Sequence, residues 1–312
     1  PPERLRFVHD NNKLLGKVRL QQVRVAPNVG CRVADWAASN SSAAYVSECY
    51  PEWSEVRFSR HDRAPIVVNA RGPQECAKAD GADGDEPAIA CETQTYEWVS
   101  RRGTGLAPFR GWLYWYDGSG YMLELPNDYT AARTLLAQLR ADDWLGAPTR
   151  ALWVDFSVYN ANINRFCVVR LLFERLHNGG VVPYAQVRSL HLLWYARSDW
   201  LLVLIPECTL MLLVVYYVLT EINQMRRAGR KYWSDPWNFW DWANICSFIV
   251  MAAARYQAYR GMSSLRTQMA ESPDDSYFNF QNVAAYAEME STATAFSAVL
   301  TYLKVLAYLA RV

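Results

Sequence analysis

The sequence predicts two domains of different class: an α+β domain with an antiparallel sheet and helices over residues 1–198, and an all-α transmembrane helix bundle over residues 199–312. The first part has the mixed composition of a globular protein and strand-like alternation of apolar and polar residues. The second part contains long apolar runs with few charges. A cluster of basic residues between two of these runs predicts the orientation of the chain in a membrane.

Two strands, a hairpin and a helix support the α+β assignment. In ALWVDFSVYN, residues 151–160, apolar and polar side chains alternate, which predicts a strand with one buried face. Residues 165–174 predict a second strand, and residues 109–125 predict a hairpin with DGSG at its tip. Residues 130–144 predict a helix whose leucines share one face.

The composition disfavours several classes of function. The net charge is +1, so the chain lacks the basic excess typical of nucleic-acid partners. The four histidines are scattered, and no metalloprotease, phosphate-loop or dinucleotide motif occurs. We therefore expect a protein that is not an enzyme and does not bind nucleic acid.

Four cysteines and one sequon suggest an oxidising compartment for the first domain. Cys31 and Cys49 flank one polar loop, and Cys76 and Cys91 flank another, so two loop-closing disulfides are expected. The alternative is four unpaired surface thiols, which are reactive and seldom tolerated. Asn40 starts the sequon NSS inside the first loop and is a candidate glycosylation site.

The apolar runs predict membrane helices near residues 199–225, 237–258 and 291–312. The loop between the first two runs is basic, and such loops lie on the cytoplasmic side. Its basic residues are Arg226, Arg227, Arg230 and Lys231. Residues 1–198 are therefore expected on the extracellular or lumenal side, in agreement with the cysteines. The abrupt start and end also predict that the sequence is part of a longer chain.

Polar residues at the two ends of this basic loop suggest a metal site. Glu221 and Gln224 are three residues apart at the end of the first helix, and Asn238 and Asp241 are three apart at the start of the second. Each pair shares a helix face, so the short loop could bring the four together. Two carboxylates and two amide carbonyls suit Ca²⁺. In the alternative, Asn238 caps the second helix and Asp241 interacts with its dipole.

Several motifs resemble the polycystin family, the polycystin-2-like branch of TRP-type cation channels. They occur in the family's order and span nearly the whole chain. The motifs are KLLGKVRLQQVRV, the Cys31–Cys49 loop ending in ECY, GSGYMLEL, WLGAPTRALWVDFSVYNANIN, RFCVVRLLFE followed by GGVVP, YYVLTEI and WNFWDW.

The resemblance implies an extracytosolic polycystin domain in the first part, with a disulfide matching Cys31 and Cys49. The second part would hold the second to fourth helices of a voltage-sensor-like domain. The family's first helix would lie upstream and its pore downstream. Related channels hold a calcium ion between the second and third helices, with ligands that match Glu221, Gln224, Asn238 and Asp241.

The resemblance also implies a function: a subunit of a tetrameric, calcium-permeable, non-selective cation channel in which the extracytosolic domain drives assembly and gating. The implied partners are membrane lipid, identical or polycystin-1-like subunits, and extracellular glycoproteins. The implied location is a ciliary or flagellar, plasma or endoplasmic reticulum membrane. The alternative is a membrane-tethered adhesion or assembly module, polycystin-1-like and without its own pore.

The last helix departs from the family pattern of two basic residues three apart. Lys304 is followed at that spacing by Ala307, and the next basic residue is Arg311. Because each gating charge contributes about 2.3 kcal/mol per 100 mV, one missing charge predicts weak voltage dependence. Lys304 is expected to pair with Glu207 or Asp241.

Overall fold

The structure, a computed structural model, describes residues 7–8, 11–27, 49–53, 63–64, 66–69, 93–193, 200–272 and 276–309. The chain divides into two compact units. Unit 1 comprises Pro1–Ala161, Cys167–Arg188 and Gln268–Asn279, and unit 2 comprises Asn162–Phe166, Ser189–Thr267 and Phe280–Val312. A short segment that lies between two membrane-domain helices in the sequence, Gln268–Asn279, thus packs with the sheet unit.

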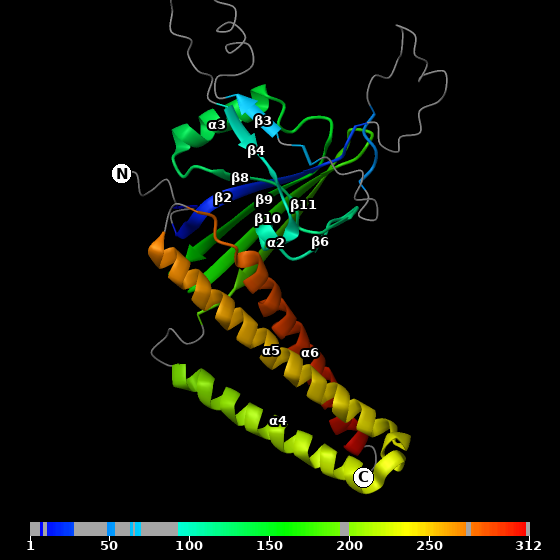
Figure 1. The fold of residues 1–312 in the computed structure, drawn as a ribbon. Helices are drawn as coiled ribbons and strands as arrows, with labels where there is room; N and C mark the ends of the chain where they lie inside the picture. Colours follow the sequence, from blue (N-terminus) through cyan, green and yellow to red (C-terminus); the bar gives the residue numbers. More distant parts are fainter. Residues whose placement is uncertain are drawn as a thin grey trace, which may run out of the picture. The chain divides into compact units, whose positions relative to one another are not determined.

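Unit 1 is built on a seven-stranded sheet with the order β11-β10-β9-β2-β8-β5, and β1 pairs with β2 off this path (Figure 1). The strands are β1 (Phe7–Val8), β2 (Asn12–Arg24), β5 (Trp98–Val99), β8 (Gly120–Leu125), β9 (Thr149–Asn160), β10 (Arg165–Arg175) and β11 (Val181–Leu190). The long strand β2 is central and runs antiparallel to both β8 and β9. The α+β fold class expected for this part is confirmed.

Smaller elements surround this sheet. They are the two-stranded pairs β3 (Ile66–Asn69) with β4 (Thr93–Tyr96) and β6 (Phe109–Arg110) with β7 (Trp115–Tyr116), and the helices α2 (Arg101–Thr104) and α3 (Tyr129–Ala141). Helix α3 starts after Asp128, whose Oδ2 accepts a hydrogen bond from the backbone N–H of Ala131 at 2.8 Å. This cap satisfies one of the free N–H groups in the first turn.

Strand β9 is covered on both faces, although its alternation predicted one buried face. Leu152 and Val154 pack against a core cluster that contains Tyr121 and Trp144. On the opposite face, Trp153 belongs to a second cluster, with Asp155 also fully buried. A charged residue can be buried on this face because Asp155 is paired with the buried Arg170. The alternation of apolar and polar residues along β9 cannot reveal such a partner on another strand.

A hairpin is present within residues 109–125, but the prediction that DGSG forms its turn is wrong. The observed hairpin joins β6 to β7, with Phe109 opposite Tyr116, so residues 111–114 form the connection. The DGSG stretch instead links β7 to β8, and Asp117 Oδ1 accepts hydrogen bonds from the backbone N–H and the hydroxyl of Ser119. An aspartate that bonds two residues ahead makes a local turn without pairing the flanking strands.

Gly16 lets the segment before α6 approach strand β2 closely. Its φ is +67°, and a Cβ there would lie 2.4 Å from the carbonyl oxygen of Ser276. The neighbouring Lys17 N–H donates to that same oxygen at 3.2 Å. Only glycine combines this backbone conformation with this contact.

Unit 2 contains three long helices: α4 (Trp200–Ala228), α5 (Pro236–Glu271) and α6 (Phe280–Leu309), with the 3₁₀ helix η3 (Gly229–Ser234) between α4 and α5. All three helices predicted for this part are present. Helix α5 continues beyond the predicted residue 258, and α6 begins before the predicted residue 291. Both extensions are too polar to be recognised as apolar runs in the sequence. They are nevertheless packed, because Met262, Leu265 and Val283 within them are buried.

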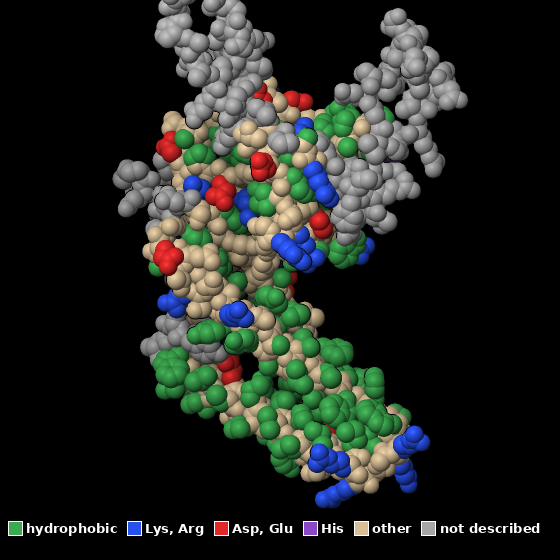
Figure 2. All heavy atoms as spheres, in the orientation of Figure 1, with side chains coloured by type: hydrophobic (Ala, Val, Ile, Leu, Met, Phe, Trp, Pro, Cys, Tyr) green, Lys and Arg blue, Asp and Glu red, His purple; other side chains and the backbone are tan. Residues whose placement is uncertain are grey.

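Among the described residues, one stretch, Trp200–Ser234, is long and apolar enough to cross a membrane, and none of its most apolar window is buried. Large side chains such as Leu202, Leu212 and Tyr216 are exposed along α4. Figure 2 shows apolar atoms over the helices of unit 2 and basic atoms at the end where α4 meets η3. Such a surface is expected to face lipid.

Candidate cation site and charge pairs

Glu221 is the buried carboxylate near the cytoplasmic end predicted for α4. It is 6% exposed, and its Oε2 accepts a hydrogen bond of 2.6 Å from the hydroxyl of Tyr232 in η3. The Tyr232 oxygen in turn accepts a bond of 3.0 Å from the indole N–H of Trp242. The turn between α4 and α5 therefore folds back and fixes the position of this carboxylate.

Asn238 lies in the first turn of α5, but it does not cap the helix. Its side-chain nitrogen donates to the backbone oxygen of Tyr232 at 2.6 Å. The capping contact is made by Asp235, whose Oδ1 accepts from the N–H of Trp237 at 3.0 Å. The capping alternative for Asn238 is therefore not what the structure shows.

Asp241 forms an ion pair with Lys304 of α6, and both side chains are partly buried. Of the two partners expected for Lys304, this is the one that it contacts. A cavity of about 370 Å³ opens beside the pair. Its lining residues are Val214, Tyr217, Glu221, Asp241, Asn244, Ile245, Phe248, Thr301, Lys304 and Val305.

The cavity unites two of the four predicted calcium ligands, Glu221 and Asp241. Gln224 is exposed, and neither it nor Asn238 is among the lining residues. Asn244 and Thr301 add an amide and a hydroxyl oxygen, so the donor set is of the hard oxygen type that Ca²⁺ takes. Within the described residues no group of three or more His, Cys, Asp or Glu side chains is placed to hold a metal.

Asn244 and Thr301 were missed by sequence reasoning. Asn244 is three residues after Asp241 and on the same helix face, a spacing that could have identified it. Thr301 could not be identified in this way, because it comes from a helix nearly 60 residues downstream and meets Asn244 only in the fold, at 3.4 Å.

A second group of charges lies fourteen residues, or two heptads, from the Asp241–Lys304 pair along α5 and α6. Arg255 of α5 bonds Glu290 of α6 through Nη1 at 2.7 Å, and its Nη2 is paired with Glu207 of α4. Glu207, expected as an alternative partner for Lys304, is instead held by Arg255. It lies fourteen residues from Glu221 along α4, or about 21 Å, so it cannot reach the level of Lys304.

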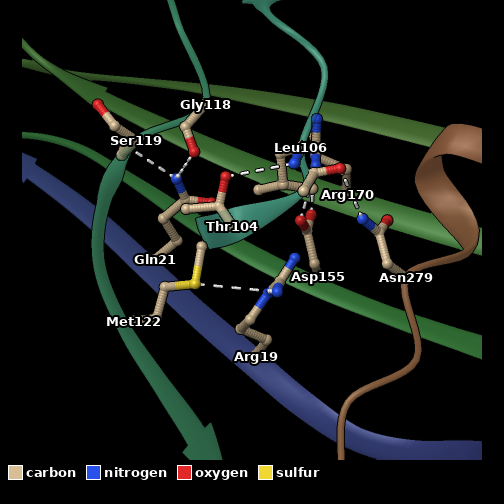
Figure 3. A network of polar contacts seen from close by, with 11 residues as sticks. Arg19, Gln21, Thr104, Leu106, Gly118, Ser119, Met122, Asp155, Arg170 and Asn279 are labelled. Atoms are coloured by element: carbon tan, nitrogen blue, oxygen red, sulfur yellow. Dashed lines mark hydrogen bonds and ion pairs between the residues drawn. The ribbon is translucent and has the colours of Figure 1, made fainter. Parts of the chain in front are cut away.

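In unit 1, a buried charge network ties the segment before α6 to the sheet (Figure 3). Arg170 bonds Asp155 in a bidentate manner, Nε to Oδ1 at 2.9 Å and Nη2 to Oδ2 at 2.8 Å. The guanidinium of Arg19 lies 3.7 Å from the ring centroid of Tyr277. Burial, with the Asp155 charge adding to it, raises the pKa of Tyr277, so its phenol stays protonated. Asn279 donates to the Gly105 oxygen at 3.3 Å.

Glu174 organises the β6–β7 hairpin. Its Oε2 accepts from the backbone N–H groups of Trp112 at 2.7 Å and Leu113 at 3.0 Å, and its Oε1 accepts from the Tyr116 hydroxyl at 2.9 Å. Burial, followed by the Glu174 charge, raises the pKa of Tyr116. The hairpin thus holds Trp112, which is 72% exposed, on a rigid base.

Several predicted residues lie outside the part of the chain that the structure describes: Cys31, Asn40, Cys76, Cys91 and Arg311. Cys49 is within it, but its expected partner is not. Both disulfides, the glycosylation site and the second gating charge therefore stay predictions.

An antiparallel sheet domain followed by helices with an apolar, membrane-length stretch and paired charges defines a class of membrane protein with a large domain outside the bilayer. Residues 3–193 match the polycystin domain, and residues 195–311 match the polycystin cation channel family. The chain belongs to the polycystin family, a family of cation channels and not of enzymes, as the motifs indicated.

Named relatives agree with this assignment. The chain is 30% identical over 306 residues to polycystin-2-like protein 1 of Homo sapiens, covering 97% of this chain and 34% of that protein. It is 30% identical over 240 residues to polycystin-2 of Danio rerio, covering 77% of this chain and 23% of that protein. The chain therefore spans about a quarter to a third of the length of these two relatives.

Proposed function

We propose that the chain is part of a subunit of a tetrameric, calcium-permeable, non-selective cation channel, in which unit 1 drives assembly and gating. The observation that carries the proposal is the joint match of a polycystin domain and a polycystin cation channel, in that order, over nearly the whole chain. The paired charges inside unit 2 also fit a domain that responds to signals.

The test is single-channel recording from the full-length protein purified into a lipid bilayer. We expect cation currents with calcium as one charge carrier, and a mass measurement in native membranes that gives four subunits. The control is a bilayer that receives the same detergent buffer without protein. Silence under every calcium and voltage condition would favour the second candidate.

That second candidate is a membrane-tethered adhesion or assembly module without its own pore. It is favoured by matches to polycystin-1-like protein 3 of Mus musculus, 29% identical over 157 residues, and to polycystin-1-like protein 1 of Homo sapiens, 32% identical over 144 residues. Assembly with a subunit of that kind would also reconcile the two candidates, because the partner could complete a mixed tetramer.

For regulation, we infer that Ca²⁺ binds in the cavity between Glu221 and Asp241. These two carboxylates would hold the ion, with oxygens from Asn244 and Thr301 nearby. Lys304 already neutralises Asp241, so an arriving cation must compete with its ammonium group. Binding would therefore release α6 from one of its contacts with α5 and could shift the helices between arrangements.

Calcium titration of the full-length protein by calorimetry tests this site. We expect Glu221→Ala and Asp241→Ala to weaken binding, because each removes a carboxylate. Lys304→Gln should strengthen binding, because it removes the competing cation. Gln224→Ala, at an exposed position, is the matched control and should leave the affinity unchanged. Affinities that are equal in all variants would eliminate the site.

A further inference from the structure

Two ion pairs join α5 to α6 in the same register. Asp241 pairs with Lys304, and Arg255 pairs with Glu290. The two partners on α5 are fourteen residues apart, and so are the two on α6, with no other charged residue between them on either helix. Two heptads return a helix to nearly the same face, so the pairs lie on one seam about 21 Å apart.

Small side chains close this seam between the pairs. The hydroxyl of Ser247 donates to the backbone oxygen of Ala293 at 2.8 Å, and the hydroxyl of Ser297 donates to Asn244 Oδ1 at 2.7 Å. Further along, Ala258 is fully buried, and a Cβ on Gly261 would lie 2.8 Å from a methyl group of Val283. Small residues and interhelical hydrogen bonds allow close, specific helix packing in membranes.

The order of the charges opposes sliding in both directions. On α5 the negative Asp241 precedes the positive Arg255, and on α6 the negative Glu290 precedes the positive Lys304. Because the helices are antiparallel, movement of α6 one way brings Lys304 toward Arg255. Movement the other way brings Glu290 toward Asp241. Either shift pulls both ion pairs apart and shortens one like-charge distance, and the loss of the two attractions inside the protein is the larger cost.

We propose that α5 and α6 form a register-locked hairpin whose own four seam charges cancel, so that membrane voltage does no net work on it. Glu207, which also pairs with Arg255, belongs to α4 and is not counted among these four. The proposal rests on the channel function proposed above and concerns which signal moves this part of the channel. Two positive and two negative charges that travel together through a field contribute equal and opposite terms. Each ion pair is neutral by itself, so neutralising only one member of a pair, such as Glu290 or Arg255, should create a voltage response.

Recordings of the full-length channel at fixed calcium test the cancellation. Glu290→Gln leaves one net positive charge, so the ratio of open to closed channels should gain up to about 50-fold per 100 mV for each subunit, equivalent to about 2.3 kcal/mol. Arg255→Gln leaves one net negative charge and should produce a slope of the opposite sign. The double variant Arg255→Gln/Glu290→Gln removes the pair but keeps the charge at zero, and should stay as shallow as the wild type.

Two results in these recordings would overturn the proposal. One is a wild-type voltage response that is already steep. The other is a double variant that is as steep as Glu290→Gln, because the effect would then come from the broken pair and not from net charge.

Cross-linking in liposomes tests the locked register without requiring current. Ser247→Cys/Ala293→Cys, in a Cys246→Ala background, places two thiols across the seam. We expect equal disulfide yields with and without an imposed membrane potential, whereas a yield that changes with potential would overturn the proposal. If the wild type never conducts, the channel function fails while this measurement still decides whether the hairpin is locked.

Discussion

Asp155 and Arg170 illustrate, at the scale of single residues, how unit 1 buries charge inside its sheet. Both are almost fully buried, and the bidentate contact satisfies the two carboxylate oxygens. Loss of one partner from such a pair typically costs about 3–5 kcal/mol, because the other charge stays buried and uncompensated. The pair therefore explains why a charged residue stands within the alternation of β9.

Tyr96 gives a prediction about pH. Burial raises its pKa from 10.0 to about 12, and its hydroxyl has no hydrogen-bond partner among the described residues. The unfolded chain loses this proton first as pH rises. The ionisation of Tyr96 therefore leaves the stability of the folded state unchanged below pH 10 and lowers it as pH rises from 10 through about 12.

We expect Tyr96→Phe to keep or raise the stability of unit 1 at neutral pH and to reduce the alkaline loss between pH 10 and 12. Denaturant unfolding followed by tryptophan fluorescence measures both effects. The control is Tyr121→Phe, which removes a hydroxyl that donates to the Ala64 oxygen at 2.6 Å and should cost about 1 kcal/mol. An unchanged alkaline profile for Tyr96→Phe would contradict the prediction.

At the scale of elements, the contact between β2 and the segment 276–279 links the sheet to the chain that enters α6. Gly16 and Lys17 meet Ser276, while Arg19 lies over the ring of Tyr277. The charges of Asp155 and Arg170 also act on Tyr277 of this segment, and Figure 3 draws Asn279 in the same network of polar contacts. The segment is therefore held to β2 by a backbone hydrogen bond and a cation–π contact.

Gly16→Ala should detach this segment. The new Cβ would lie within 2.4 Å of the Ser276 oxygen, so the segment must move and the Lys17 N–H loses its acceptor. Faster hydrogen exchange at the Lys17 amide and across residues 276–279 is the expected result.

The matched control is Gly105→Ala. Its φ of +63° imposes similar backbone strain, but nothing lies within 4 Å of the added Cβ. This variant should lose a comparable amount of stability, about 1–2 kcal/mol, without faster exchange at Lys17. Equal exchange in the two variants would show that strain alone, and not the contact, explains the effect.

At the scale of the whole molecule, the chain passes between the units more than once. Helices α5 and α6 both run into Gln268–Asn279, which belongs to the sheet unit. The boundary between the units therefore falls inside α5 and again at the start of α6, and not at a single point in the sequence.

Labelling can test the orientation proposed for the two units. Arg101→Cys, in α2, should react with a membrane-impermeant thiol reagent from the outside of intact cells. Arg230→Cys, in the basic turn η3, should react only after the membrane is permeabilised, because basic loops remain on the cytoplasmic side. The unsubstituted chain gives the background, and reaction of both cysteines from the same side would reject the proposed topology.

The sequence by itself determined the class of each unit and the family. Alternation in β9, the apolar run of α4 and the basic turn are local patterns, because strand period, membrane thickness and charge placement all act on neighbouring residues. The same local logic located Glu221 and Asp241, whose spacing relative to the turn placed them at one level.

Only the tertiary structure decided the partners. It assigned Arg170 to Asp155, Arg255 to Glu207 and Glu290, and the Ser276 segment to Gly16. It also moved the hairpin turn from DGSG to residues 111–114, where buried Glu174 accepts the backbone N–H groups. Such contacts join residues far apart in the chain, and their energy depends on distance and burial, which no local pattern contains.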